Sequence, residues 1–345
     1  MQMRTLGRTG LSVSELGFGC GAVGGLLVRG DPQAMRRAVA RALDAGINYF
    51  DTARMYGNGQ SETNLGQILQ ELQADVVVGT KVQLRPHELD RIEQAVTESL
   101  EGSLQRLRRE QVDLFQLHNP IALQRKPERE WVALADVEPV IRTFERLQAQ
   151  GKIRFWGLNG LGETAALHQA VAQSHAYTLQ SCYNLLNPTA GVPTPADFAF
   201  QDYGQLIDRA ATQGMGVIAI RVLAAGALSG SAERHPVAAQ GVAPIASGQD
   251  LSEDAAHAQK FRFLVDEGYV TSLVEAAIRF ALSKPEVSTT LVGISSLEQL
   301  EAALASAEKG PLPAAALARL NAVWASLTVV TGFPSPASNT MPLPP

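Results

Sequence analysis

Short apolar runs, rich in β-branched and aromatic residues, alternate along the chain with segments in which apolar residues recur at helical spacing. The runs predict eight strands, at residues 15–20, 47–52, 75–81, 112–118, 153–159, 177–184, 215–223 and 288–294. The segments between and after them predict eight helices, at residues 32–45, 61–72, 89–107, 138–150, 164–173, 203–213, 273–283 and 297–308. Regular alternation of strand and helix implies parallel strands joined by right-handed crossovers.

Eight strand–helix units favour an α/β fold in which the sheet closes into a (β/α)8 TIM barrel, with an open doubly wound sheet as the alternative. Residues that favour helix starts or ends stand at the expected boundaries: Asp31, Pro32, Gly46, Gly151 and Gly214. Before the first strand, residues 4–13 predict a small β-hairpin that turns at Thr9 and Gly10. This hairpin is expected to close the bottom of the barrel.

Two predicted connections are longer than a barrel requires, and the chain ends in a segment of different composition. The connections are residues 119–137, after the fourth strand, and residues 224–269, after the seventh. Long connections in compact domains usually bind or cover ligands, so both are predicted to be extended loops on the active-site rim. We therefore expect a single barrel domain over residues 1–330 and a Pro-rich tail over residues 331–345.

Composition and charge exclude several classes of function. The chain has 345 residues, of which 46% are hydrophobic and 18% charged, so it can bury a large core. A net charge of -5 argues against nucleic acid or an anionic membrane as a partner. No apolar stretch is long enough to cross a membrane and the N-terminus has no apolar run typical of a secretion signal, so a cytoplasmic protein is expected. Cys20 and Cys182 lack metal-ligand spacing, and no metal site is expected.

Ionisable residues end three consecutive predicted strands. Asp51, Lys81 and His118 close the second, third and fourth strands, and Tyr56 follows in the loop after the second. Each residue alone has an ordinary structural interpretation as a cap, a surface charge or a core histidine. Because the carboxyl ends of parallel barrel strands meet at one rim, the four side chains are predicted to converge there.

The four residues have distinct chemical capacities. A free tyrosine has a pKa of about 10, and acting as an acid near pH 7 calls for a pKa lower by roughly 3, which is about 4 kcal/mol. A lysine ammonium about 4 Å from the phenol supplies about 4 kcal/mol at an effective dielectric constant near 20, although burial of the phenol opposes it. Lys81 is therefore expected to lower the pKa of Tyr56, with Asp51 keeping Lys81 charged and oriented. His118 could donate a hydrogen bond to a carbonyl oxygen.

These motifs together resemble the aldo-keto reductase family. The resemblance rests on Phe50-Asp51-Thr52-Ala53, Tyr56-Gly57, Ser61-Glu62, Gly79-Thr80-Lys81 and Gln116-Leu117-His118, and residues 4–14 resemble the start of its bacterial members. It implies an (α/β)8 barrel that binds a nicotinamide cofactor without a Gly-rich Rossmann loop. It also implies that Asp51, Tyr56, Lys81 and His118 form a catalytic tetrad. Tyr56 would be the general acid in hydride transfer to the carbonyl carbon of an aldehyde or ketone.

The resemblance also implies a set of cofactor contacts. Asn159 stands where the family commonly has Ser and could bind the nicotinamide carboxamide, whereas Gly160 replaces the family's Asn. Gln180 matches the second carboxamide ligand, and Ile220 replaces the aromatic residue that often stacks under nicotinamide. Further positions match the phosphate-contacting loops, and the whole implied set is Gly19, Cys20, Asp51, Asn159, Gln180, Arg221, Leu223, Gly293, Ser295 and Gln299.

The choice of cofactor and the direction of reaction have alternatives. NADP(H) is predicted from the family. A 2′-phosphate is normally bound by Arg or Lys, and no basic residue lies between Leu291 and Ala307, so NAD(H) is the alternative. Arg234 or Lys260, in the connection after the seventh strand, could bind the 2′-phosphate instead. The same tetrad could serve an NAD-linked sugar dehydrogenase or a cofactor-sensing binding subunit with little turnover. A Schiff-base enzyme would need a neutral Lys81, which Asp51 disfavours. The expected partner is a small carbonyl or sugar substrate, and residues 21–27 and Trp131 are candidates to line its pocket.

Overall fold

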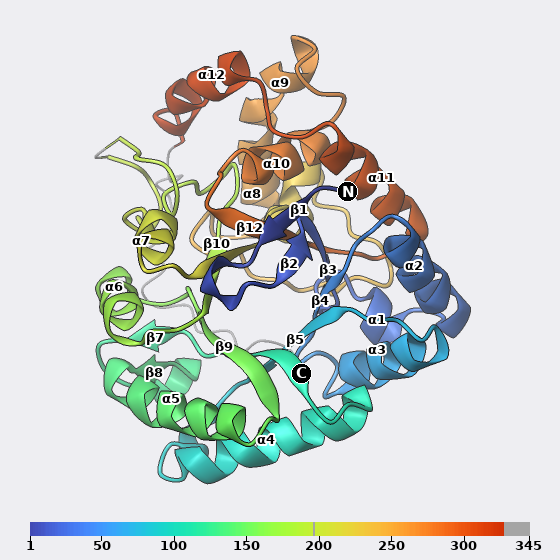
Figure 1. The fold of residues 1–345 in the computed structure, drawn as a ribbon. Helices are drawn as coiled ribbons and strands as arrows, with labels where there is room; N and C mark the ends of the chain where they lie inside the picture. Colours follow the sequence, from blue (N-terminus) through green and yellow to red (C-terminus); the bar gives the residue numbers. More distant parts are fainter. Residues whose placement is uncertain (196, 328–345) are drawn as a thin grey trace.

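Eight parallel strands close into a barrel in the computed structural model, which describes residues 1–195 and 197–327 (Figure 1). The strands follow one another around the barrel in chain order, and β12 pairs with β3 to close it. They are β3 (Leu16–Gly19), β4 (Tyr49–Asp51), β5 (Val77–Val82), β6 (Val112–Leu117), β9 (Ile153–Asn159), β10 (Thr178–Cys182), β11 (Gly216–Ile220) and β12 (Val287–Gly293). The predicted (β/α)8 barrel is confirmed, and the open sheet is wrong. The predicted tail at residues 331–345 lies outside the described residues.

Helices surround the barrel on its outer face (Figure 1). Those that follow the barrel strands are α2 (Pro32–Asp44), α3 (Gln60–Glu71), α4 (Ile92–Leu107), α5 (Leu134–Ala149), α6 (Thr164–Gln173), α7 (Leu206–Thr212), α10 (Leu273–Leu282) and α11 (Leu297–Glu308). The Asp31 side chain caps α2 by accepting a hydrogen bond from the Ala34 amide at 2.9 Å, as its position before Pro32 predicts. All eight predicted helices are present, with bounds that differ from the prediction by a few residues at most.

Residues of each strand alternate between the barrel interior and the helix layer, as the period of two requires. In β4, Tyr49 belongs to the interior cluster with Val77 and Leu114, whereas Phe50 packs in the outer core beneath the helices. Asp51, two residues after Tyr49, is therefore on the interior face. This alternation determines which side chains of the strand ends can face the mouth of the barrel.

The N-terminal hairpin covers the barrel end opposite the strand carboxyl ends. It consists of β1 (Met3–Thr5), a 3₁₀ turn at Gly7–Thr9 and β2 (Ser12–Ser14), and it lies across the barrel in the foreground of Figure 1. Its Leu6, Leu11 and Val13 side chains fill the interior cluster. Gly7 has a φ of 51°, and a Cβ there would lie 2.1 Å from the Gly216 nitrogen at the start of β11. The predicted hairpin at the bottom of the barrel is confirmed.

The two long connections both follow carboxyl ends of strands, as predicted. The first contains β7 (Ile121–Ala122), a 3₁₀ turn at Pro127–Arg129 and β8 (Val132–Ala133), and α5 begins four residues before the predicted position. The second contains a 3₁₀ segment (Ala224–Ser229), α8 (Leu251–Ala258), a 3₁₀ turn (Gln259–Phe261) and α9 (Phe263–Asp266).

The second connection is fastened to the loop after β3. Arg234 Nη2 donates to the Val23 carbonyl at 2.9 Å, and Arg29 Nε donates to the Val237 carbonyl at 2.8 Å. The Ala239 amide also donates to the Ala22 carbonyl at 3.3 Å. The two rim loops therefore lie against each other at the mouth of the barrel.

Several details differ from the predicted pattern. The strand predicted over residues 215–223 ends at Ile220, because Arg221 has a φ of 57° and leaves the extended conformation. Besides α8 and α9 in the second connection, two more helices of the described residues lie where none is predicted, α1 (Leu26–Arg29) and α12 (Ala314–Trp324). The buried face of α12 includes Trp324, whose Nε1 donates to the Leu185 carbonyl at 2.8 Å. Within the described residues, no helix is long and apolar enough to span a membrane.

Candidate active site

Asp51, Tyr56, Lys81 and His118 lie together at the carboxyl ends of β4, β5 and β6. Lys81 Nζ forms a short ion pair with Asp51 Oδ1, donates to the Thr52 carbonyl at 2.8 Å and lies 3.3 Å from Tyr56 Oη. The rings of Tyr56 and His118 meet edge to face with centroids 5.7 Å apart. Asp51 and Lys81 are buried, whereas Tyr56 and His118 are partly exposed. The structure thus brings the four predicted side chains into one cluster with its phenol and imidazole toward solvent.

A hydrogen-bond network behind the cluster fixes the loop that carries Tyr56. The hydroxyls of Thr52 and Ser61 lie 2.8 Å apart, and Ser61 Oγ donates to the Cys20 carbonyl at 2.9 Å. The next residue, Glu62, is fully buried and accepts from Thr80 Oγ1 at 2.5 Å and from Arg106 Nε at 2.7 Å. These bonds tie the start of α3 to β3, β5 and α4, and they hold the loop over residues 52–60 in place.

The electrostatics of Lys81 and Tyr56 differ in one respect from the prediction. Burial lowers the pKa of Lys81, but the Asp51 charge and hydrogen bonds to Asp51 and Tyr56 outweigh it, so the pKa lies above its usual value. Burial raises the pKa of Tyr56, and the opposing charge of Lys81 does not cancel this, so the pKa of Tyr56 also lies above its usual value. The expectation that Lys81 brings the phenol pKa toward neutrality is wrong for this state, because the loss of solvation is the larger effect.

His118 is neutral in the folded protein over the physiological pH range. Burial, and then the positive charge of Lys81, lowers the pKa of His118 to about 3. Its backbone amide donates to the Val82 carbonyl at 2.8 Å, and its Nδ1 is buried without a partner among the described residues. A neutral imidazole with an N–H directed at a ligand can polarise a carbonyl oxygen without contributing a charge.

The low pKa of His118 makes folding pH-dependent. Below pH 6.5 the unfolded chain binds a proton at this site and the folded protein does not, so stability falls as the pH falls from about 6.5 toward 3. We expect His118 to contribute up to about 1.4 kcal/mol of destabilisation per pH unit in that window. Urea unfolding between pH 7.5 and 4.5 measures this slope. The slope of the free energy of unfolding against pH should flatten in His118→Asn. It should persist in the control His87→Asn, because His87 is exposed. An unchanged slope in His118→Asn would contradict a neutral His118.

The implied carboxamide ligands have their amide nitrogens occupied. Asn159 Nδ2 donates to the His118 carbonyl at 2.7 Å, and Gln180 Nε2 donates to Asp51 Oδ2 at 2.7 Å. Asn159 Oδ1 is buried and has no partner within the described part of the chain. An unpartnered buried oxygen is costly unless a ligand satisfies it, so Asn159 is suited to accept a hydrogen bond from a bound group.

The remaining implied cofactor positions lie around the adjoining part of the rim. Gly19 and Gly293 end neighbouring strands and pair in register, and buried Cys20 follows Gly19. Leu223 precedes the 3₁₀ segment after β11. Ser295 Oγ donates to the Gly24 carbonyl at 2.7 Å, and its amide donates to Gln299 Oε1 at 2.9 Å. Ser295 therefore contacts the loop after β3, and Leu223 stands at the start of the connection that is fastened to that loop.

Three arginines lie near these loops: Arg29, Arg221 and Arg234. Of these, Arg29 is not among the residues predicted from the sequence. Burial, and then the positive charges of Arg221 and Arg29, lowers the pKa of Arg234. Within the described ranges none of the three forms an ion pair with a carboxylate, and Arg234 Nε is buried without a partner. Lys260, the other predicted phosphate ligand, donates instead to the Ser326 carbonyl beyond α12. Neighbouring positive charges without acidic partners are suited to bind an anion.

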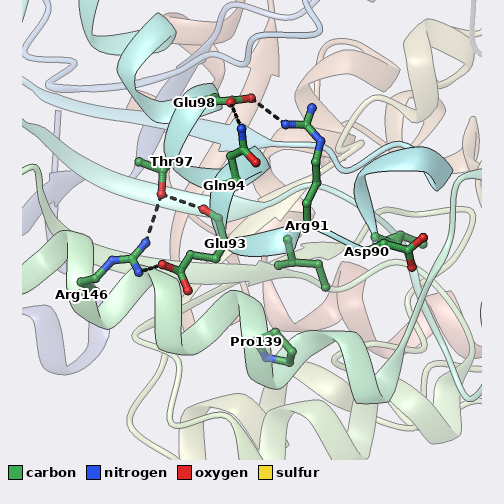
Figure 2. A pocket seen from close by; sticks show the side chains of 10 residues that line it. Asp90, Arg91, Glu93, Gln94, Thr97, Glu98, Pro139 and Arg146 are labelled. Carbon is green, nitrogen blue, oxygen red and sulfur yellow. Dashed lines mark hydrogen bonds and ion pairs between the residues drawn. The ribbon is translucent and has the colours of Figure 1, made fainter.

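A groove of about 650 Å³ between α4 and α5 is separate from this cluster (Figure 2). Four of its five charged side chains pair with one another: Arg91 with Glu98 at 3.2 Å, and Arg146 with Glu93 through a short ion pair. None of the four clustered side chains lines it. Trp131, a candidate pocket residue, lies on the loop after β6 with Lys126 Nζ 4.9 Å from its ring centroid.

Comparisons with known proteins agree with this architecture. Residues 15–325 match the model of the Aldo/keto reductase family. The chain is 30% identical over 313 residues to L-galactose dehydrogenase of Arabidopsis thaliana, covering 87% of this chain and 86% of that protein. It is 26% identical to a probable voltage-gated potassium channel subunit beta of Oryza sativa subsp. japonica, covering 87% and 89%. The holo form of aldo-keto reductase AKR11C1 from Bacillus halodurans superposes with a TM-score of 0.70 at 25% identity, covering 96% of this chain and 99% of that one. The chain belongs to the aldo/keto reductase family of oxidoreductases.

Proposed function

We propose that this protein uses NADP(H) to reduce the carbonyl group of an aldehyde or ketone to an alcohol, with Tyr56 as the proton donor. The observation that carries the proposal is the contact of Lys81 Nζ with Tyr56 Oη at 3.3 Å, where Lys81 is itself held by Asp51. When bound, the reduced nicotinamide would supply the hydride. A small-molecule carbonyl compound is the proposed partner.

The residues of the cluster can each act on the developing charge of the substrate oxygen. Because the pKa of Tyr56 is raised, the phenol keeps its proton at neutral pH and can donate it as the carbonyl oxygen becomes negative. The Lys81 ammonium then stabilises the phenolate that remains. Neutral His118 can donate a hydrogen bond to the same carbonyl oxygen and orient it. Asp51 keeps Lys81 charged and in place.

Features of the rim support binding of a dinucleotide. With both amide nitrogens occupied, the oxygens of Asn159 and Gln180 are the atoms available to accept from a carboxamide NH₂ group. Arg29, Arg221 and Arg234 supply positive charge for phosphates. Three guanidinium groups that form no ion pair within the described residues offer one more cation than the two phosphates of NAD(H) need, which favours NADP(H), with NAD(H) as the alternative.

We expect purified protein to bind NADPH more tightly than NADH, and Arg234→Met to weaken NADPH binding by about tenfold or more, the cost of losing a hydrogen bond to a charged group. Titration with each nucleotide, followed by its fluorescence, gives the two dissociation constants. Arg262→Met is a matched control, because Arg262 is an exposed arginine paired with Asp266 on the outer surface. Equal affinity for both nucleotides in wild type would remove the preference for NADP(H), and no binding of either would overturn the proposed function.

A sugar dehydrogenase using the same four residues is the second candidate, and the relative named as L-galactose dehydrogenase favours it. Oxidation requires Tyr56 as a base, and its raised pKa opposes this at neutral pH, so oxidation should accelerate with rising pH while reduction does not. Parallel assays of aldehyde reduction and sugar oxidation at pH 7 and pH 9 separate the two. Nucleotide binding without turnover in either assay would instead favour a binding subunit, as the name of the potassium channel relative suggests.

A further inference from the structure

Tyr49 lies inside the barrel directly beneath Asp51 and contacts it. Its side chain is fully buried on the interior face of β4. Tyr49 Oη donates a hydrogen bond to Asp51 Oδ2 at 3.1 Å, and Gln180 Nε2 donates to the same oxygen at 2.7 Å. Lys81 Nζ occupies the other oxygen, Oδ1. The Asp51 carboxylate is therefore held by one cation and two neutral donors.

The neighbouring strand leaves room for the Tyr49 hydroxyl. Gly79 on β5 pairs in register with Asp51. A Cβ at Gly79 would lie 2.8 Å from Tyr49 Oη, closer than a carbon atom can approach without displacement, but 3.4 Å from Asp51 Oδ2. A side chain at this position would therefore displace the hydroxyl before it disturbed the carboxylate.

We propose that Tyr49 is a positioning residue for the reaction: its hydroxyl fixes the Asp51 carboxylate, which in turn holds Lys81 against Tyr56. This inference rests on the proposed function. With the Tyr49 donor lost and Gln180 Nε2 left alone on Oδ2, the carboxylate could rotate about its remaining hydrogen bonds and draw Lys81 Nζ away from Tyr56 Oη. A neutral hydroxyl prevents this without adding a second positive charge that would compete with Lys81 for Asp51.

We expect Tyr49→Phe to lower kcat by about tenfold while leaving the KM for the nucleotide within twofold, since small misplacements of reacting groups are costly. Removing the dipole of the hydroxyl also exposes Tyr56 to more of the Asp51 charge, so Tyr56 should ionise at a higher pH than in wild type. Tyr183→Phe is the matched control: Tyr183 is equally buried, but it stacks on Phe280 in the helix layer, 4.8 Å between centroids. It should change neither measurement.

A double-mutant cycle with Gly79→Ala tests the contact itself. Alone, Gly79→Ala should lower kcat because its methyl group displaces the Tyr49 hydroxyl. In the Tyr49→Phe background that hydroxyl is absent, and adding Gly79→Ala should cost at most twofold more. Fully additive losses would show that the two positions act independently and would overturn the proposal.

A measurement without substrate separates this proposal from the proposed function. The difference in phenolate absorbance between each protein and its Tyr56→Phe counterpart follows Tyr56 alone through an alkaline titration. A shift to higher pH in Tyr49→Phe, absent in Tyr183→Phe, supports the positioning role even if no carbonyl compound is reduced by wild type. An unchanged Tyr56 titration, or a kcat within twofold of wild type in an active protein, overturns it.

Discussion

Replacing Tyr56 with Phe is expected to lower kcat for carbonyl reduction by about 10²–10⁴-fold, the range attributed to a positioned general acid. Phe keeps the ring and its edge-to-face contact with His118, so the shape of the site should be retained. The dissociation constant for NADPH should stay within a few-fold of wild type, because Tyr56 acts on the substrate oxygen. Single-turnover oxidation of bound NADPH by an excess of aldehyde measures the step directly.

The matched control is Tyr177→Phe. Tyr177 precedes β10, at the opposite end of the barrel, and its ring packs against Phe155 and Trp156. Loss of its hydroxyl should leave both turnover and nucleotide binding unchanged. A Tyr56→Phe variant that retains more than a tenth of wild-type turnover would show that another group donates the proton.

The architecture could be predicted because its signals are local. Strand and helix periods repeat eight times, and residues such as Asp31 and Gly46 mark helix ends through conformations that depend on a few neighbours. The errors occur where tertiary contacts decide. Arg221 lies within an apolar run, but its positive φ ends β11. The helix α12 is recognisable chiefly because Trp324 contacts the segment after β10.

The cluster at the rim could be predicted for the same reason, since strand ends in a parallel barrel share one edge. Its supporting contacts could not, because they join positions that are distant in sequence. In the sequence, Tyr49 has the pattern of an ordinary apolar strand residue. Its role depends on contacts that only the fold creates: it shares the acceptor Asp51 Oδ2 with Gln180, and Gly79 leaves room for its hydroxyl. The pKa of Tyr56 likewise depends on the balance between burial, which raises it, and the positive charge of Lys81, which lowers it. The spacing of residues along the chain does not determine that balance.

Replacing Lys81 with Met should abolish measurable reduction and also destabilise the fold by about 3–5 kcal/mol, the cost of leaving one partner of a buried ion pair alone. Asp51 would keep only the neutral donors Tyr49 and Gln180. Urea unfolding gives the stability change, and the aldehyde assay gives the activity. Lys152→Met is the control, since Lys152 pairs with Glu101 at 2.8 Å on the surface and should cost less than about 1 kcal/mol.

A second variant separates the two effects of Lys81. In Lys81→Met combined with Asp51→Asn, no buried charge is left unpaired, so most of the lost stability should return. Activity should not return, because the ammonium that stabilises the Tyr56 phenolate is still missing. If the double variant regains turnover along with stability, then Lys81 maintains the fold of the site and its charge is not what enables Tyr56 to donate a proton.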